Sequence, residues 1–126
     1  MRDVLNTPRA IREAVRAAIP TWEQESMWVV PLDARGRGVP IMVALGTADS
    51  VHVYPRDVFR EAIRANATGI VLSHNHPSGE GSPSAQDRVL TSRLQAAGDL
   101  LGIPILDHVI VTEGGAYYSF AENGDL

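Results

Sequence analysis

The sequence contains no cysteine and no lysine. Without cysteine there are no disulfides, thiolate nucleophiles or cysteine-based zinc sites, so histidines and carboxylates must hold any metal. All 11 basic residues are arginines, and the net charge of −4 has the wrong sign for a protein that binds phosphate backbones. No apolar run is long enough for a membrane span, and no signal-peptide pattern follows Met1. These absences are compatible with the cytoplasmic location that we expect.

The length and the composition fit a single globular domain. The chain has 126 residues, of which 44% are hydrophobic and 21% are charged, so it can bury a sizeable core. No internal repeat, low-complexity tract or linker divides it. We therefore expect one domain that spans residues 1–126.

Hydrophobic periodicity and turn residues predict three helices and a set of strands. Helices are expected at residues 7–19, 55–65 and 85–101, the last of them ending at Gly102. Strands are expected at residues 26–32, 39–45, 51–53, 70–72, 106–112 and 116–120. This order predicts a mixed α/β fold in which helices pack on a mixed sheet.

Three local features carry further expectations. Pro31 lies inside the first long strand, and a proline within a strand predicts an edge position or a bulge. His52 alternates with two valines, so we expect it to face solvent or a sheet edge and assign it no role. The polar tail at residues 122–126 is expected to fray.

The apolar run at residues 70–72 leads directly into a stretch rich in polar side chains. Side chains alternate along a strand, so His74 and His76 point to one side and Asn75 to the other. A loop rich in glycine, serine and proline then turns the chain back, and Ser84 suits a helix N-cap with Asp87 in the first turn. Two imidazoles and a carboxylate can therefore converge, which suits a zinc ion with one open position. The alternative is that these side chains are satisfied polar groups at a strand end and in a helix cap.

The spacing of these residues resembles a known metal-binding signature. The pattern His-x-His, seven residues and Ser-x-x-Asp is similar to that of the JAMM/MPN+ metalloproteases, and the stretch at 74–87 most resembles their bacterial RadC-like branch. Three further segments resemble that branch in the same order: GTADSV, YPRDVFREAIRANA and LDHVIV. The resemblance implies a JAB/MPN-like domain of cytidine-deaminase-like architecture, with a curved, partly barrel-like mixed sheet flanked by helices. It also implies one zinc ion per chain, held by His74, His76 and Asp87.

The resemblance also implies two catalytic residues. RadC-like sequences carry an acid/base glutamate just before the first long strand, and Glu25 matches that place. The residues alone do not separate Glu25 from Glu23. Ser84 matches the family serine whose hydroxyl would support the oxyanion on a scissile carbonyl. Helix capping is its competing role, and one hydroxyl is not expected to fill both roles.

Three other polar residues lie near these motifs. Spacing alone does not exclude Glu80 as the acid/base residue, but it lies in a loop flanked by glycines, with nothing to hold it. Asp107 and His108 are adjacent in an apolar strand, so their side chains point to opposite faces. His108 either supports a metal ligand or is a buried, hydrogen-bonded structural residue, and the sequence leaves both open.

The expected function is that of a zinc-dependent metalloprotease or isopeptidase, in which an activated water hydrolyses an amide or isopeptide bond. The substrate would be a peptide or protein, including a ubiquitin-like conjugate, or a small amide. Two alternatives stay open: a DNA-repair or DNA-associated protein, and a metal-stabilised interaction module without turnover. The resemblance implies an additional N-terminal helical domain related to DNA binders, which we do not expect within these 126 residues. Nothing in the sequence indicates direct nucleic-acid binding, a membrane partner or a particular oligomeric state.

Overall fold

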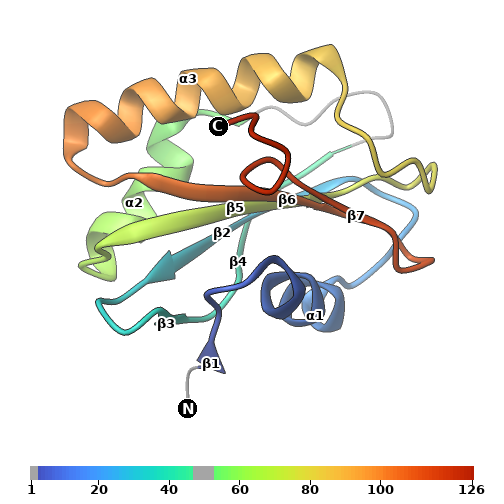
Figure 1. Cartoon of the computed structure of the whole chain (residues 1–126), viewed down its shortest axis with the longest axis horizontal. Helices are drawn as coiled ribbons and strands as arrows, with labels where there is room; N and C mark the ends of the chain where they lie inside the picture. Colours follow the sequence, from blue (N-terminus) through green and yellow to red (C-terminus); the bar gives the residue numbers. More distant parts are fainter. Residues whose placement is uncertain (1–2, 47–52) are drawn as a thin grey trace.

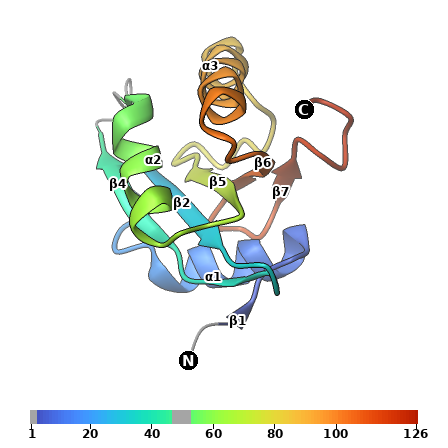
Figure 2. The same ribbon diagram turned by 90° about the vertical axis from the view of Figure 1, so that its left-hand side faces the viewer.

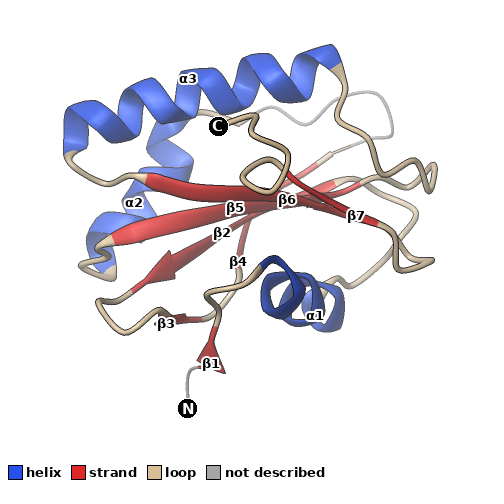
Figure 3. Ribbon diagram, viewed as in Figure 1, coloured by secondary structure: helices blue, strands red, loops and turns tan. Residues whose placement is uncertain are grey.

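The fold is described from a computed structural model, which describes residues 3–46 and 53–126 (Figure 1). In chain order the elements are β1 (Asp3–Val4), α1 (Pro8–Ala18), β2 (Ser26–Leu32), β3 (Arg37–Gly38), β4 (Ile41–Leu45), α2 (Pro55–Arg64), β5 (Gly69–Asn75), α3 (Ala85–Leu101), β6 (Ile105–Val111) and β7 (Tyr117–Ser119). The expected α/β class is confirmed, and Figure 3 distinguishes its helices from its strands. The strand expected at 51–53, with His52, falls largely outside the described residues. Among the described residues no helix has the length and apolar character needed to cross a bilayer.

The sheet order explains how distant polar residues reach one place. The strands lie in the order β4-β2-β5-β6-β7, with α2 and α3 on one face of this sheet and α1 on the other (Figures 1 and 2). Among the strands of residues 3–46 and 53–126, only β5 and β6 pair in parallel. A parallel pair needs a long crossover, and α3 supplies it, so α3 begins near the end of β5. The sheet is not closed into a barrel, which corrects the partly barrel-like expectation, since the three-residue β7 ends the ladder without meeting β4.

Each face of the sheet buries its own layer of apolar side chains. Alternation along β5 sends Ile70 and Leu72 toward α2 and α3, and Val71 toward α1. The first layer includes Phe59 of α2, and the second includes Val15 of α1. Because both faces are covered, β5 has a continuous apolar sequence until it reaches its polar end.

Pro31 does not mark an edge strand, because β2 lies between β4 and β5. Pairing with β4 ends at Val29, whereas Pro31 pairs with Ile70 of β5. A residue without an N–H is tolerated where no neighbouring strand needs that donor. The expectation of an edge strand is therefore wrong, and the register irregularity in β2 lies between Met27 and Trp28.

The tail at residues 122–126 packs back on the domain, contrary to the expectation that it frays. The Asp125 N–H donates to the Phe120 carbonyl at 2.8 Å. The Asp125 carboxylate lies 3.2 Å from the Arg88 guanidinium of α3 and accepts from the Tyr118 hydroxyl. The two side-chain partners come from α3 and β7, so the composition of the tail alone did not reveal them.

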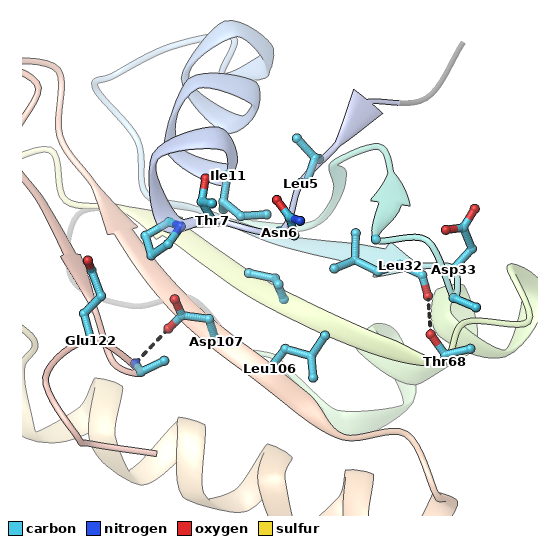
Figure 4. Close-up of a pocket in the computed structure, with 15 residues that line it drawn as sticks. Leu5, Asn6, Thr7, Ile11, Leu32, Asp33, Thr68, Leu106, Asp107 and Glu122 are labelled. Carbon is cyan, nitrogen blue, oxygen red and sulfur yellow. Dashed lines mark hydrogen bonds between the residues drawn. The ribbon is translucent and has the colours of Figure 1, made fainter.

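A cavity of about 590 Å³ lies on the α1 face of the sheet (Figure 4). It is lined mainly by apolar side chains, among them Ile11, Leu32, Val71 and Leu106. Val71 and His74 are an odd number of positions apart on β5, so they face opposite sides of the sheet. The cavity is therefore separate from the histidine cluster on the other face.

Candidate metal centre

Two histidines and one aspartate meet where β5 ends and α3 begins. His74 lies near the end of β5 and is almost fully buried, and His76 follows the strand, with its N–H donated to the Val111 carbonyl at 3.1 Å. A capping box fixes Asp87 in the first turn of α3. In this box the Asp87 N–H donates to the Ser84 hydroxyl at 3.0 Å, and the Ser84 N–H donates to the Asp87 carboxylate at 2.8 Å. The predicted helix cap at Ser84 is confirmed.

The separations of the ligand atoms fit a single bound cation. The Nε2 atoms of His74 and His76 are 2.9 Å apart. The Asp87 Oδ1 is 3.2 Å from the His74 Nε2, and its Oδ2 is 3.1 Å from the His76 Nε2. Ligands about 2.0 Å from a tetrahedral zinc ion lie about 3.3 Å from one another. The three side chains therefore have roughly the spacing and the donor chemistry that a divalent metal requires.

Glu25 is the further acidic residue of this cluster. Its Oε1 lies 3.9 Å from the His74 Nε2. The ligand atoms of four residues lie within 4.8 Å of one another: Glu25, His74, His76 and Asp87. The Glu23 side chain is exposed, so the structure separates the two glutamates that the sequence could not. Glu80 contributes its main-chain carbonyl, 2.7 Å from the His76 Nδ1, so its loop orients a histidine through the main chain.

Comparison with known proteins identifies the family. A model of the RadC-like JAB domain matches residues 5–125. The chain belongs to this family. The UPF0758 protein of Thermotoga maritima is 48% identical over 105 residues, which cover 82% of this chain and 47% of the relative. The UPF0758 protein of Chromobacterium violaceum is 44% identical over 125 residues, 98% of this chain and 55% of the relative. The chain thus spans about half the length of the curated relatives it matches.

Asn75, the middle residue of the His-x-His motif in this RadC-like JAB domain, holds the segment that carries Glu25. Its Oδ1 accepts from the Ser26 N–H at 2.7 Å and from the Ser26 hydroxyl at 2.8 Å, and its Nδ2 donates to the Gln24 carbonyl at 2.9 Å. The Gly46 N–H also donates to the Glu25 carbonyl at 2.9 Å. The main chain on both sides of Glu25 is therefore tied to the strand that carries the histidines. This role of Asn75 was not predicted from the sequence. Its one sequence signal is that the Asn75 amide points to the opposite side of the strand from the two imidazoles.

His108 of β6 is fully buried beside His74. Its Nε2 lies 2.7 Å from the His74 Nδ1, and its Nδ1 lies 2.6 Å from the Thr91 hydroxyl. The Asp107 carboxylate, by contrast, accepts from the Ser119 hydroxyl at 2.6 Å. His108 is therefore a buried, hydrogen-bonded residue, and it also contacts a candidate ligand.

The charges of the cluster shift its pKa values in the metal-free protein. Burial raises the pKa of Asp87, but hydrogen bonds from His74 and His76 outweigh it and hold that pKa well below its usual range. Burial lowers the pKa of His76, but its bond to Asp87 leaves the net pKa above the ordinary value. Burial raises the pKa of Glu25, and the histidines only partly offset this. An ionised Asp87 suits a metal ligand, and a Glu25 of raised basicity suits an acid/base group.

Ser84 is exposed at the edge of the cluster. Its oxygen accepts the Asp87 N–H, which uses a lone pair and leaves the hydroxyl proton available. Capping needs an acceptor and oxyanion support needs a donor. The two roles that the sequence set against each other are therefore compatible in one hydroxyl.

Proposed function

We propose that this RadC-like JAB domain is a zinc-dependent metallohydrolase that cleaves amide or isopeptide bonds. The convergence of His74, His76 and Asp87 on one point, with the Glu25 carboxylate 3.9 Å from the His74 Nε2, carries the proposal. Three protein ligands with an open position and one unbound carboxylate are typical of hydrolytic zinc sites. The proposed ligands are the two Nε2 atoms and the Asp87 carboxylate.

A zinc ion bound there would supply Lewis acidity, polarising a carbonyl and lowering the pKa of water toward neutrality. Glu25 takes the proton of the attacking water and returns it to the leaving nitrogen. Its burial, which raises its pKa, favours this exchange near neutral pH. Asn75 keeps the Glu25 main chain in place through its bonds to Gln24 and Ser26.

Ser84 would donate its hydroxyl proton to the oxygen of the scissile carbonyl as negative charge develops there. The position of Ser84 as N-cap of α3 supports this role, because the cap fixes the oxygen and leaves the proton free. The helix N-terminus adds positive potential on the same side. The substrate that we propose is a peptide or protein, including a ubiquitin-like conjugate.

A matched pair of glutamate variants tests this function. Purified protein is stripped with a chelator, reloaded with one equivalent of zinc and incubated with peptide-linked and isopeptide-linked model substrates. Wild type and Glu23→Gln, in which the exposed glutamate is changed, should cleave alike. Glu25→Gln should keep its zinc and lose activity by about 10²-fold or more. His76→Ala should lose roughly one equivalent of zinc.

Three results would contradict the proposal. If His76→Ala retains its zinc, the proposed set of three metal ligands is wrong. Zinc that binds normally, with no cleavage by wild type and no difference in Glu25→Gln, would identify a metal-stabilised interaction module. Binding to duplex DNA that weakens steeply with salt would favour the DNA-associated alternative instead.

A further inference from the structure

We propose that His108 and Thr91 are positioning residues of the metal centre, which fix the tautomer of His74 so that its Nε2 lone pair faces the metal. The inference rests on the proposed function only in assigning a metal to this cluster. Each proton in the hydrogen-bond chain can be placed from the chemistry of its partners, starting at a main-chain carbonyl that can only accept. The chain runs from Asp87 through Thr91 and His108 to His74.

The first link fixes the Thr91 proton. The Thr91 Oγ1 lies 2.7 Å from the Asp87 carbonyl oxygen, one helical turn earlier in α3. A carbonyl has no proton to give, so the Thr91 hydroxyl is the donor. Its single proton is thereby used, and toward any other partner the Thr91 oxygen can only accept.

The second link fixes the tautomer of His108. The His108 Nδ1 lies 2.6 Å from the Thr91 Oγ1, which can only accept, so Nδ1 carries a proton. His108 is fully buried, and the partners of its two ring nitrogens are the Thr91 hydroxyl and the His74 ring, neither of which is an anion. A buried positive charge without an anionic partner is strongly unfavourable, so the ring is neutral. A neutral imidazole with a proton on Nδ1 has its lone pair on Nε2.

The third link passes this direction to His74. The His108 Nε2 lies 2.7 Å from the His74 Nδ1, and since Nε2 accepts, the His74 Nδ1 must donate. The other nitrogen of His74, Nε2, is then free to present its lone pair to a bound metal. It lies 3.2 Å from the carboxylate of Asp87, with which it forms a hydrogen bond in the metal-free protein. Metal-bound histidines usually donate their second N–H in this way, which orients the ring and selects the tautomer.

The two candidate ligands reach the same tautomer by different routes. The His76 Nδ1 lies 2.7 Å from the Glu80 carbonyl, a single bond to the main chain of an exposed loop. His74 instead depends on a chain of two buried side chains, Thr91 and His108. Substitutions in that chain should therefore act on the metal through His74 while leaving His76 and its loop unchanged.

A packing role of His108 has to be separated from this one. Its ring stacks on Phe120 with the centroids 4.8 Å apart and the planes at 11°. His108→Phe keeps an aromatic ring for this stack but removes the acceptor for His74. His108→Gln returns an amide oxygen that can accept in its place. Thr91→Val removes the hydroxyl at nearly constant shape, and Thr91→Ser keeps it.

Zinc affinity and imidazole NMR test the proposal without any substrate. Zinc affinity is measured by competition with a chromophoric chelator, and long-range ¹H–¹⁵N spectra of the metal-free protein read the protonated nitrogen of each ring. Wild type should show Nδ1-protonated His74 and His108. Thr91→Val and His108→Phe should bind zinc about 10-fold to 100-fold more weakly. Thr91→Ser and His108→Gln should recover most of this loss, while a merely structural role would leave the tautomers unchanged.

The outcomes separate this proposal from the proposed function. If Thr91→Val and His108→Phe bind zinc as tightly as wild type, while His76→Ala does not bind it, the positioning role is overturned and the metal site stands. If wild type shows His74 protonated on Nε2 but not on Nδ1, the chain of donors runs the other way and the inference is wrong. If wild type binds no zinc, both the proposed function and the metal-positioning role are overturned.

Discussion

Replacing Asn75 by alanine should lower the stability of the domain while leaving its zinc affinity nearly unchanged. The change removes three hydrogen bonds, of 2.7, 2.8 and 2.9 Å, from a side chain that is fully buried. Each such bond contributes about 1 kcal/mol net, and the Ser26 N–H is left without its partner inside the protein. We expect the free energy of unfolding to fall by about 3–4 kcal/mol, a large share of the roughly 5–15 kcal/mol typical of a domain.

Ser73→Ala is the matched control for this change. Ser73 lies two residues earlier on the same face of β5, is also fully buried, and donates one hydrogen bond to the Val109 carbonyl at 2.7 Å. It has no bond to the segment that carries Glu25, and its loss should cost about 1 kcal/mol. Urea unfolding of the two metal-free variants gives the comparison, and chelator competition gives their zinc affinities.

Asn75→Ala should retain zinc affinity within about threefold of wild type, because the hydrogen bonds of Asn75 do not reach the three proposed ligands. Its hydrolytic activity should fall at least about 10-fold, since Glu25 is no longer held at its two flanking residues. Ser73→Ala should keep both properties. Parallel loss of zinc affinity and activity in Asn75→Ala would refute the reasoning, as would a stability loss no larger than that of Ser73→Ala.

Three further predictions concern the metal, pH and packing. Removing zinc that was present at roughly 1,000 times its Kd should lower the unfolding free energy by about 4 kcal/mol, and His76→Ala, followed by thermal unfolding, should show no such response. Without metal, the lowered pKa of Asp87 gives stability that is full above about pH 4 and lost as pH falls. The raised pKa of His76 gives stability that is full below about pH 6.5 and lost as pH rises. Urea unfolding should therefore find the metal-free maximum between these values, and a flat profile from pH 5 to about pH 8 would contradict it. Gly98→Ala should destabilise the domain by about 1–3 kcal/mol, because its Cβ would lie 2.4 Å from the Ile103 carbonyl oxygen. A urea midpoint of unfolding equal to that of wild type would show that this close contact does not form.

Much of the fold and part of the candidate site could be predicted from local sequence patterns. Thr7 and Ser84 as N-caps and Gly102 as a left-handed C-cap are set by the residues within one turn, so the helix ends agree with expectation. The shared direction of His74 and His76 follows from strand alternation, which holds wherever the strand lies in the sheet. The capping box places the Asp87 carboxylate on the same grounds.

Strand order and register decided the rest. Pro31 was expected at an edge position or a bulge because its missing N–H is visible in the sequence, whereas the point at which β2 stops pairing with β4, at Val29, is not. From the sequence, only the family resemblance favoured Glu25 over Glu23. In the structure Met27 pairs with His74, and this pairing sets the segment before β2 beside the histidine rings. A slip of one residue in that pairing would turn every side chain to the opposite face.

The sequence by itself determined what each short segment could offer: two imidazoles on one side of a strand, and a carboxylate held in the first turn of a helix. Those choices depend on neighbours within a few residues, where backbone geometry leaves few alternatives. Only the tertiary structure decided which distant groups lie beside these side chains. Glu25, from the segment before β2, lies near His74, Asn75 binds the segment that carries Glu25, and His108 contacts His74 from the other side. The physical reason is that these contacts join residues up to 51 positions apart, so they depend on how strands pair and not on what any one strand contains.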